Sequence, residues 1–544
     1  MKRPCRRPPA SLHLLMLAAL AATAAFAPAR TAHAFDIATG VDDLKLRWDT
    51  TVKYTAAARV REQSPLLIGG ANYDDGDRNF KRGLINNRLD LLSEADLSYG
   101  AFGGRISGAG WYDSVYRQDG DHDSPATSNT TSTAFPGFPE GTRKLHGKKG
   151  ELLDAFVYGR FDLGDEARLN FRAGRHTLQW GESLFFGSNA IAGGMAPVDV
   201  IKALSVPNTQ FKELLRPVGQ VSGQLQLASN LAVGAYVQYK WEPHRLPGAG
   251  SYFSSSDAAP GTGELLLLGP GLAIPQTPEV RAKNSGQGGL QLRWRPAGLE
   301  TDLGFYAIRY HDKAPQLYMH AAAVAPGVVV PTDYYFVYPE GINAYGVSAT
   351  HTVGDYNLAA EVSVRKNAPL SSTAAVQIPA LGVASQPARG TTWHANFSWL
   401  ASLGPSFVAQ EASFVGEIAA NYTEKVTQGE DHLDPNSRRS GLGLRLSYEP
   451  TYRQALNGLD VGVPVGIGYA PAGKSSAGGG LGAHHGGDMS IGLNLTYLDV
   501  WRMSLAYTHY YGPEGLFLDA ANHQTFLNTT RDRDFVALSI RRTF

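Results

Sequence analysis

Strict alternation of apolar and polar residues recurs along this chain and limits the folds open to it. In residues 290–295, Leu, Leu and Trp alternate with Gln, Arg and Arg, so one face is apolar and the other is polar. Successive side chains of a strand point to opposite faces, whereas a helix would need a period of about 3.6 residues. The pattern therefore predicts amphipathic strands. The same alternation occurs in residues 44–56, 168–173, 219–227, 356–365, 441–447 and 491–497.

Short and long connections take turns between these predicted strands. Tight polar turns fall at residues 164–165, 229–230, 296–298, 354–355, 403–405 and 498–499. Long loops fall near residues 61–83, 118–150, 181–217, 243–285, 312–340, 367–390, 423–438, 470–487 and 512–532. Short periplasmic turns and long extracellular loops are typical of outer-membrane barrels. The pattern predicts an all-β, antiparallel up-and-down transmembrane β-barrel of about eighteen strands, and about sixteen remains open because predicted boundaries shift by a few residues.

The N-terminus has the three parts of a secretory signal peptide. Basic residues lie at positions 2, 3, 6 and 7, an apolar run covers residues 12–26, and Ala-His-Ala at 32–34 offers a cleavage site. We expect residues 1–34 to be removed and residues 35–544 to form a single outer-membrane barrel domain in a Gram-negative bacterium. The only cysteine, Cys5, precedes the apolar run, which argues against a lipid anchor.

The last predicted strand ends the chain on an aromatic residue, Phe544. Val536, Leu538 and Ile540 share its apolar face. This segment resembles the C-terminal signal by which the barrel-assembly machinery recognises its clients, so that machinery and outer-membrane lipid are expected partners. Arg542 departs from the signal, where an apolar or aromatic residue is usual, and we expect its side chain to reach towards the membrane interface.

Several longer motifs resemble those of one family. Residues 72–80 read Asn-Tyr-Asp-Asp-Gly-Asp-Arg-Asn-Phe, and further matches lie at residues 87–94, 174–183, 197–200, 212–213 and 338–341. They resemble the domain-of-unknown-function family thirteen-oh-two of Gram-negative outer-membrane proteins, over nearly the whole mature chain. The resemblance implies proteins whose genes often neighbour a periplasmic carrier and inner-membrane exporters, and hence the handling of hydrophobic molecules such as steroids, terpenoids or lipids.

The polar faces of the predicted strands carry charges that would point into the barrel. A barrel of about eighteen strands is wide enough to enclose a water-filled passage. Charges of both signs there would favour polar or amphipathic solutes, whereas the other interpretation is that they pair across strands and fill the interior. The candidate residues for the solute path are Arg168, Arg172, Arg293, Arg295, Arg445, Asp154 and Glu361.

The loop over residues 181–217 is long and unusually apolar. An exposed loop of this kind would promote aggregation, so we expect it to fold into the barrel mouth as a constriction or plug. A lid that packs against neighbouring loops without contacting solute is the alternative. The candidate constriction residues are Trp180, Glu182, Phe185, Phe186 and Phe211.

A second apolar segment lies in the loop over residues 243–285. Residues 265–268 read Leu-Leu-Leu-Leu, and residues 272–274 read Leu-Ala-Ile. One interpretation is that the segment meets a hydrophobic ligand or the outer leaflet. The second is that it forms a short helix or an extra strand. The second interpretation is favoured.

An acidic segment around Gly76 resembles a calcium loop. Asp74, Asp75 and Asp77 are closely spaced, and carboxylates suit a hard cation. The closing glutamate of an EF-hand is absent, so a structural turn is favoured over calcium binding. Neither a metal nor a cofactor is predicted.

The sequence favours an outer-membrane channel or uptake protein through which small amphipathic or hydrophobic molecules pass passively. The alternative is a non-transporting barrel that acts as a structural or docking partner of a periplasmic carrier. An outer-membrane hydrolase is less favoured, since the G-x-S-x-G and H-E-x-x-H motifs are absent. No catalytic residue and no nucleic-acid partner are predicted.

Overall fold

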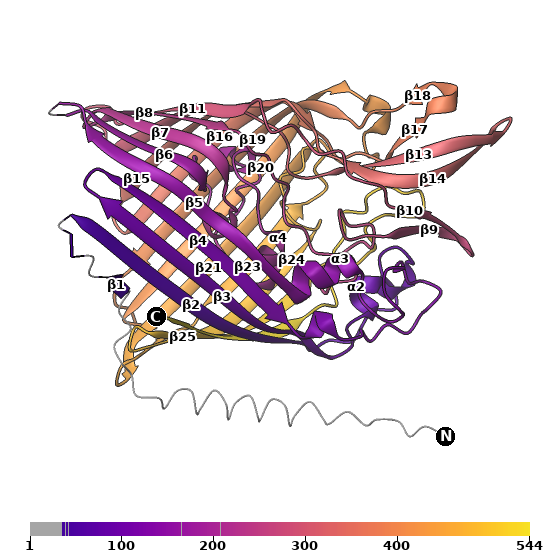
Figure 1. Ribbon diagram of the computed structural model, residues 1–544, viewed down its shortest axis with the longest axis horizontal. Coiled ribbons are helices and arrows are strands. Elements are labelled where there is room, and N and C mark those ends of the chain that lie inside the picture. Colours follow the sequence, from indigo (N-terminus) through magenta and orange to yellow (C-terminus); the bar gives the residue numbers. More distant parts are fainter. Residues whose placement is uncertain (1–34, 38–39, 42, 165, 207) are drawn as a thin grey trace.

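The protein is a β-barrel with long loops gathered at one end, as seen in a computed structural model (Figure 1). The structure describes residues 35–544 except 38–39, 42, 165 and 207. Within this part of the chain, 18 antiparallel strands close into the barrel. The predicted fold class and the preferred strand number are confirmed.

The barrel strands neighbour one another in sequence order, as expected of hairpins joined one after another. Their bounds are β2 (Leu44–Arg59), β3 (Gly83–Tyr99), β4 (Phe102–Asp113), β5 (Lys148–Asp162), β6 (Arg168–His176), β7 (Val218–Ala228), β8 (Leu231–Gln238), β11 (Gln287–Trp294), β12 (Thr301–Tyr310), β15 (Ile342–Val353), β16 (Tyr356–Pro369), β19 (Arg389–Leu403), β20 (Glu411–Gln428), β21 (Ser440–Leu456), β22 (Leu459–Gly462), β23 (Val465–Ala472), β24 (Gly486–Tyr497), β25 (Trp501–Tyr511) and β26 (Phe535–Thr543).

The first and last long strands close the barrel. Residues 51–59 of β2 pair with β26, and β1 (Phe35–Ile37) pairs with residues 46–48 of β2, so β1 continues the line of β26. The strands β22 and β23 share one position between β21 and β24. Val463 and Pro464 separate them, and a proline cannot donate a ladder hydrogen bond.

The two faces of the strands differ as the alternation predicts. Leu290 points outward and is 61% exposed, whereas its neighbour Gln291 points inward and is buried. Val157 and Val347 are further apolar side chains on the exposed outer surface. A closed sheet has no unpaired edge, and an apolar outer face suits a lipid bilayer, so this surface is membrane-spanning.

None of the described helices has the length and apolar character needed to cross a bilayer.

Both the C-terminus and β1 lie at the short-turn end of the barrel (Figure 1). The unusual residue of the last strand, Arg542, places its guanidinium carbon 4.6 Å from the ring centre of Phe544 and 5.1 Å from that of Trp501. Stacking on two rings gives the charge favourable contacts at this end of the barrel.

The loop end carries additional hairpins. The strands β9 (Leu265–Gly269) and β10 (Leu272–Pro275) form one, so the apolar segment of this loop is a pair of extra strands. The strands β13 (Gln316–Ala325) and β14 (Val328–Val337) form another, and β13 also pairs with β17 (Ala375–Ile378), which pairs with β18 (Val383–Ala384). The β9–β10 and β13–β14 hairpins extend beyond the barrel (Figure 1).

The helices of the loops are short. An aromatic core that includes Phe80, Tyr116, Phe138, Tyr252 and Phe535 joins several of these loops to the barrel wall. The helices outside the loop between β6 and β7 are η1 (Leu67–Gly69), α2 (Asp75–Arg78), η2 (Val115–Arg117), α3 (Glu140–Thr142), η3 (Arg143–Gly147), η5 (Pro379–Leu381) and η6 (Glu430–His432).

Candidate functional site in the barrel lumen

The connection between β6 and β7, residues 177–217, enters the barrel and is called here the inner loop. It contains η4 (Ile191–Gly194), α4 (Val200–Ser205) and α5 (Phe211–Leu214). Its main anchors lie on β16, β19 and β20, and β20 stands on the far side of the barrel from β6 in the strand order. The inner loop therefore crosses the lumen.

The first anchor is the predicted residue Glu361 on β16. Its Oε2 accepts a hydrogen bond from the backbone N–H of Glu182 at 3.0 Å, and its Oε1 accepts one from that of Ile191 at 2.6 Å. Two charge-assisted hydrogen bonds offset the desolvation of this carboxylate, which is 2% exposed. Glu361 thus binds the inner loop at two points.

The second anchor is Glu417 on β20, which is fully buried. Its Oε2 accepts hydrogen bonds from three successive backbone N–H groups, those of Leu184, Phe185 and Phe186. Its Oε1 accepts further hydrogen bonds from Ser183 Oγ and Asn396 Nδ2, each at 2.7 Å. One carboxylate therefore holds a whole turn of the inner loop.

A third anchor is the amide of Asn189 in the inner loop, which contacts residues of both β19 and β20. Its Nδ2 donates to Asn396 Oδ1 and to the carbonyl of Ala420, both at 3.0 Å. Its Oδ1 accepts from Asn421 Nδ2 at 3.0 Å. The adjacent carbonyls of Ser188 and Ala190 accept from Arg365. The polar backbone of the inner loop is thus satisfied by the barrel wall.

The apolar side chains of the inner loop pack in several places. Trp180 is buried, with its ring 5.0 Å from that of Tyr236 on β8. Phe211 is buried within the inner loop itself, whereas Phe186 is buried against Ala419 of β20. Phe185 is half-buried beside Phe186. The apolar residues singled out in the sequence are therefore mostly covered by protein.

The remaining predicted charges of the lumen lie mainly in ion pairs. Arg168 pairs with Asp162, Arg295 with Asp302, and Arg445 with Asp488. Arg293 lies 3.6 Å from Glu182 of the inner loop, and Asp154 lies 3.6 Å from Arg105. Arg172 places its guanidinium over the ring of Phe156, 5.6 Å from the centre.

The exposure of these inward-facing side chains changes along the barrel. Arg168, Arg293 and Arg295 keep 46%, 44% and 59% of their side chains exposed. Glu361 and Glu417 are almost completely covered. The side chains near the short-turn end and Arg293 beside the inner loop are therefore exposed, whereas the two carboxylates that hold the inner loop are covered.

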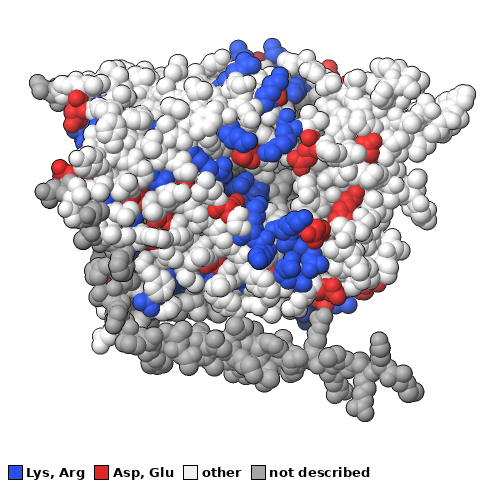
Figure 2. Space-filling model, in the orientation of Figure 1, with Lys and Arg blue, Asp and Glu red and all other residues white. Residues whose placement is uncertain are grey.

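Basic side chains gather where the inner loop leaves the wall, and Figure 2 shows a band of Lys and Arg across this face near β5 and α3. Arg245 pairs with Glu151 and, at 2.8 Å, with Asp199, and its guanidinium lies 5.2 Å from the ring centre of Trp111. Arg216 lies 3.6 Å from the same Glu151. The basic cluster is defined as Lys149, Arg175, Arg216 and Arg245.

Positive charge exceeds negative charge in this cluster. Lys149, Arg216 and Arg245 share the carboxylates of Glu151 and Asp199, and the charge of Arg175 lies beside Arg216. The Nε atoms of Arg175 and Arg216 are buried and have no hydrogen-bond partner in the described part of the chain. The cluster therefore carries an excess of positive charge, which attracts negatively charged groups.

A family model matches residues 15–544 of this sequence. The chain belongs to this family, "Protein of unknown function (DUF1302)". No curated protein matches the sequence.

Solved structures share the barrel fold with this DUF1302 protein at low identity. Acinetobacter baumannii OccAB1 is 9% identical, with a TM-score of 0.42 and coverage of 95% of this chain and 99% of that one. Pseudomonas aeruginosa OpdK with vanillate is 10% identical, with a TM-score of 0.40 and coverage of 92% and 98%. Salmonella typhi OmpF with daunomycin is 8% identical, with a TM-score of 0.38 and coverage of 94% and 100%. The likeness concerns the fold alone.

A serine and a histidine of this DUF1302 chain meet inside the barrel. His176 Nε2 lies 2.8 Å from Ser222 Oγ, but His176 Nδ1 contacts the carbonyl of Gly174 at 3.1 Å. A hydrolytic triad needs a carboxylate at that second nitrogen. The pair therefore lacks the third member of a triad.

Glu417 and the basic cluster were not predicted from the sequence. Glu417 lies on the polar face of an alternating strand, together with Ala419 and Asn421, and an acidic residue in the middle of such a strand was the available signal. Arg216 and Arg245 lie in loops, where no periodicity indicates the direction of a side chain. Only the paths of two loops bring them together.

Proposed function

We propose that this DUF1302 protein is a passive outer-membrane channel of a Gram-negative bacterium for small amphipathic or hydrophobic molecules. The short turns then face the periplasm, and residues 1–34 serve as the signal peptide. Those residues lie outside the described part of the chain, so the leader rests on its sequence pattern. The barrel-assembly machinery, recognising the C-terminal strand, inserts the protein.

The observation that carries the proposal is the inner loop across the lumen. Water-exposed arginines such as Arg293 line the space up to this loop, and buried anchors such as Glu417 hold it. A solute that follows the lumen must pass the inner loop. The inner loop is therefore the constriction in the proposed mechanism, with Trp180, Glu182, Phe185, Phe186 and Phe211 in or beside it.

The chemistry beside the constriction supports an amphipathic solute. The basic cluster offers an excess of positive charge to a negatively charged end, and the rings of Phe156 and Trp111 lie beside Arg172 of the wall and Arg245 of a loop. Luminal charges of both signs then orient the solute as it passes. Arg168, Arg172, Arg293, Arg295, Arg445, Asp154 and Glu361 belong to this proposed path or to its anchors.

One observation favours a second function, a closed barrel that docks a periplasmic carrier. Glu417 accepts hydrogen bonds from Ser183, Leu184, Phe185, Phe186 and Asn396. So many contacts to one buried carboxylate make a rigid anchor, and a rigid loop suits a permanent plug as well as a constriction.

Single-channel conductance in planar bilayers separates the two functions. The refolded protein without residues 1–34 is expected to open in steps, and an amphipathic anion such as a bile-acid salt is expected to block it from the short-turn side. Replacement of residues 183–192 by a Gly-Ser linker is expected to raise the conductance several-fold. A folded barrel that stays silent in both forms would instead support docking, and capture of a periplasmic carrier would then be the next measurement.

A further inference from the structure

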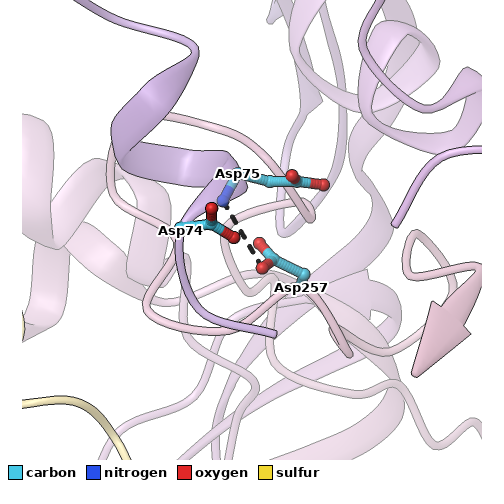
Figure 3. Close-up of side chains that lie close together, drawn as sticks. All are labelled: Asp74, Asp75 and Asp257. Atoms are coloured by element: carbon cyan, nitrogen blue, oxygen red, sulfur yellow. Dashed lines mark hydrogen bonds between the residues drawn. The ribbon is translucent and has the colours of Figure 1, made fainter. Parts of the chain in front are cut away.

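Three buried carboxylates from two distant loops meet at the loop end of the barrel. Asp74 and Asp75 lie at the start of α2, and Asp257 lies in the loop between β8 and β11, 182 residues after Asp75. One oxygen of each lies within 4.8 Å of the others. Figure 3 shows the carboxylates of Asp74 and Asp257 facing each other, with that of Asp75 turned away.

Close backbone packing brings the two loops together. A Cβ atom on Gly76 would lie 2.7 Å from the carbonyl oxygen of Ser251 and 2.8 Å from that of Ser254, so only glycine permits this approach. The backbone N–H of Asp257 donates to the carbonyl of Asn72 at 2.9 Å. The position of Asp257 is therefore set by the backbone and not by its carboxylate.

The three carboxylates differ in their partners. Asp75 is satisfied by His122 Nε2 at 2.7 Å and by the backbone N–H of Asn129 at 3.2 Å. Asp74 Oδ2 accepts from Arg78 Nε at 2.5 Å. Among the described residues, the Asp257 carboxylate receives only a long hydrogen bond, 3.4 Å from the backbone N–H of Asp75 to its Oδ2.

The other oxygen of Asp257, Oδ1, is buried and has no hydrogen-bond partner in the described part of the chain. Asp257 as a whole is only 1% exposed. Its burial, with Asp75 and Asp74 as neighbouring charges, raises the pKa of its carboxyl well above the usual range. A buried carboxylate in this position needs a proton or a cation.

The arginines around these carboxylates are already engaged. Arg533, whose charge acts on Asp257, donates its Nη1 to the carbonyls of Tyr252 and Ser254. Arg78 contacts Asp74 and, at 2.8 Å, Asp123. Arg59 lies between Asp77 and Asp532. No salt bridge joins Asp257 to a basic side chain in the described residues, so Arg533 acts on this carboxylate from a distance and does not pair with it directly.

We propose that Asp74 and Asp257 bind a divalent cation, Ca²⁺, that fastens the loop between β2 and β3 to the loop between β8 and β11. Carboxylate oxygens suit a hard cation, and the irregular arrangement suits Ca²⁺ better than Mg²⁺, which requires near-octahedral geometry. Water and loop carbonyls complete the coordination. The inference extends the acidic motif of α2, because its second ligand comes from a loop that the motif does not contain, and it is independent of the proposed transport function.

Calcium titration calorimetry of the chelator-treated, refolded protein in detergent tests the site. We expect one saturable Ca²⁺ site in the wild type and at least tenfold weaker binding in Asp257→Asn. Asp431→Asn is the matched control, because Asp431 is 83% exposed in another loop, and it should bind like the wild type. Absence of calcium binding in the wild type, or equal binding by Asp257→Asn, would overturn the proposal.

A second measurement needs no variant and distinguishes the cation from a proton. Limited trypsin digestion of the wild type at a fixed pH of 7.5 is followed with Ca²⁺ or with a chelator. We expect the chelator to speed cleavage at Arg78 several-fold, and added Ca²⁺ to reverse it. Cleavage that is the same with Ca²⁺ and with the chelator would reject the cation and leave a proton shared by Asp74 and Asp257.

Discussion

Glu417 on β20 accepts a hydrogen bond of 2.8 Å from the backbone N–H of Phe186, which lies 231 residues earlier in the inner loop. The contact joins two sides of the barrel. Because Glu417 is fully buried, its charge is stabilised only by such donors. Among the anchors of the inner loop, Glu417 is the one that accepts the most hydrogen bonds from it.

Glu417→Ala should release the inner loop. The change leaves several buried N–H groups without an acceptor and is expected to destabilise the anchored loop by about 3 kcal/mol. Hydrogen exchange at the amides of residues 184–186 should speed up by about two orders of magnitude, since 1.4 kcal/mol corresponds to roughly tenfold. Glu424→Ala on the exposed end of the same strand is the control and should leave those amides protected. Unchanged exchange in Glu417→Ala would show that other contacts suffice.

Arg293→Glu should change the ion selectivity of the proposed channel. Arg293 is 44% exposed in the lumen and lies 3.6 Å from Glu182, so the change places two acidic groups beside the constriction. We expect the permeability ratio of anions to cations to fall severalfold in reversal-potential measurements, most clearly at low salt because of weaker screening. Arg453→Glu, at the tip of a short-turn hairpin, serves as the control. Identical permeability ratios in the wild type, Arg293→Glu and Arg453→Glu would show that Arg293 lies outside the ion path.

Arg245→Met should weaken the junction between β5 and the loops. Arg245 is 9% exposed, pairs with Glu151 and Asp199, and stacks on Trp111. Breaking a buried pair costs about 3 kcal/mol. Arg281→Met is a matched control, since Arg281 also pairs with a glutamate and stacks on a tryptophan but is 53% exposed, and it should cost under about 1 kcal/mol. Urea unfolding in detergent measures the free energy of unfolding of both variants. Equal losses in Arg245→Met and Arg281→Met would contradict the prediction.

His146 should make stability depend on pH in the acidic range. Its burial and the nearby charges of Arg88, Arg245 and Lys149 lower its pKa from 6.5 to about 3. The folded state therefore binds fewer protons than the unfolded state between these values. The contribution of neutral His146 to the free energy of unfolding is therefore complete above pH 6.5. It is lost as the pH falls towards 3, by about 1.4 kcal/mol for each pH unit.

His146→Gln should flatten this pH dependence, because glutamine has an oxygen that can accept the backbone N–H of Gly248, now bonded to His146 Nε2 at 3.1 Å. Denaturant midpoints at pH 4, 5 and 6 provide the comparison. His523→Gln is the control in a more exposed position, with 31% of its side chain exposed. If the denaturant midpoint of His146→Gln falls with pH as steeply as that of the wild type, other titratable groups cause the pH dependence.

The sequence by itself determined the barrel and the order of short turns and long loops, and it favoured eighteen strands over sixteen. Each of these features is local: a period of two places side chains on opposite faces, and turn residues separate neighbouring strands that pair as hairpins. Residues 290–295 therefore indicate both the strand and the inward direction of Arg293 without knowledge of any other segment. The apolar inner loop was also marked by its composition.

Only the tertiary structure decided which distant groups meet. Glu417 and Phe186, Arg216 and Arg245, and Asp74 and Asp257 come together because irregular loops cross the barrel or pack over its mouth. No periodicity sets the path of such a loop. Its path is set by the balance of burial and hydrogen bonding over many contacts at once, so the anchors of the constriction and the proposed calcium site follow from the fold and not from any single motif.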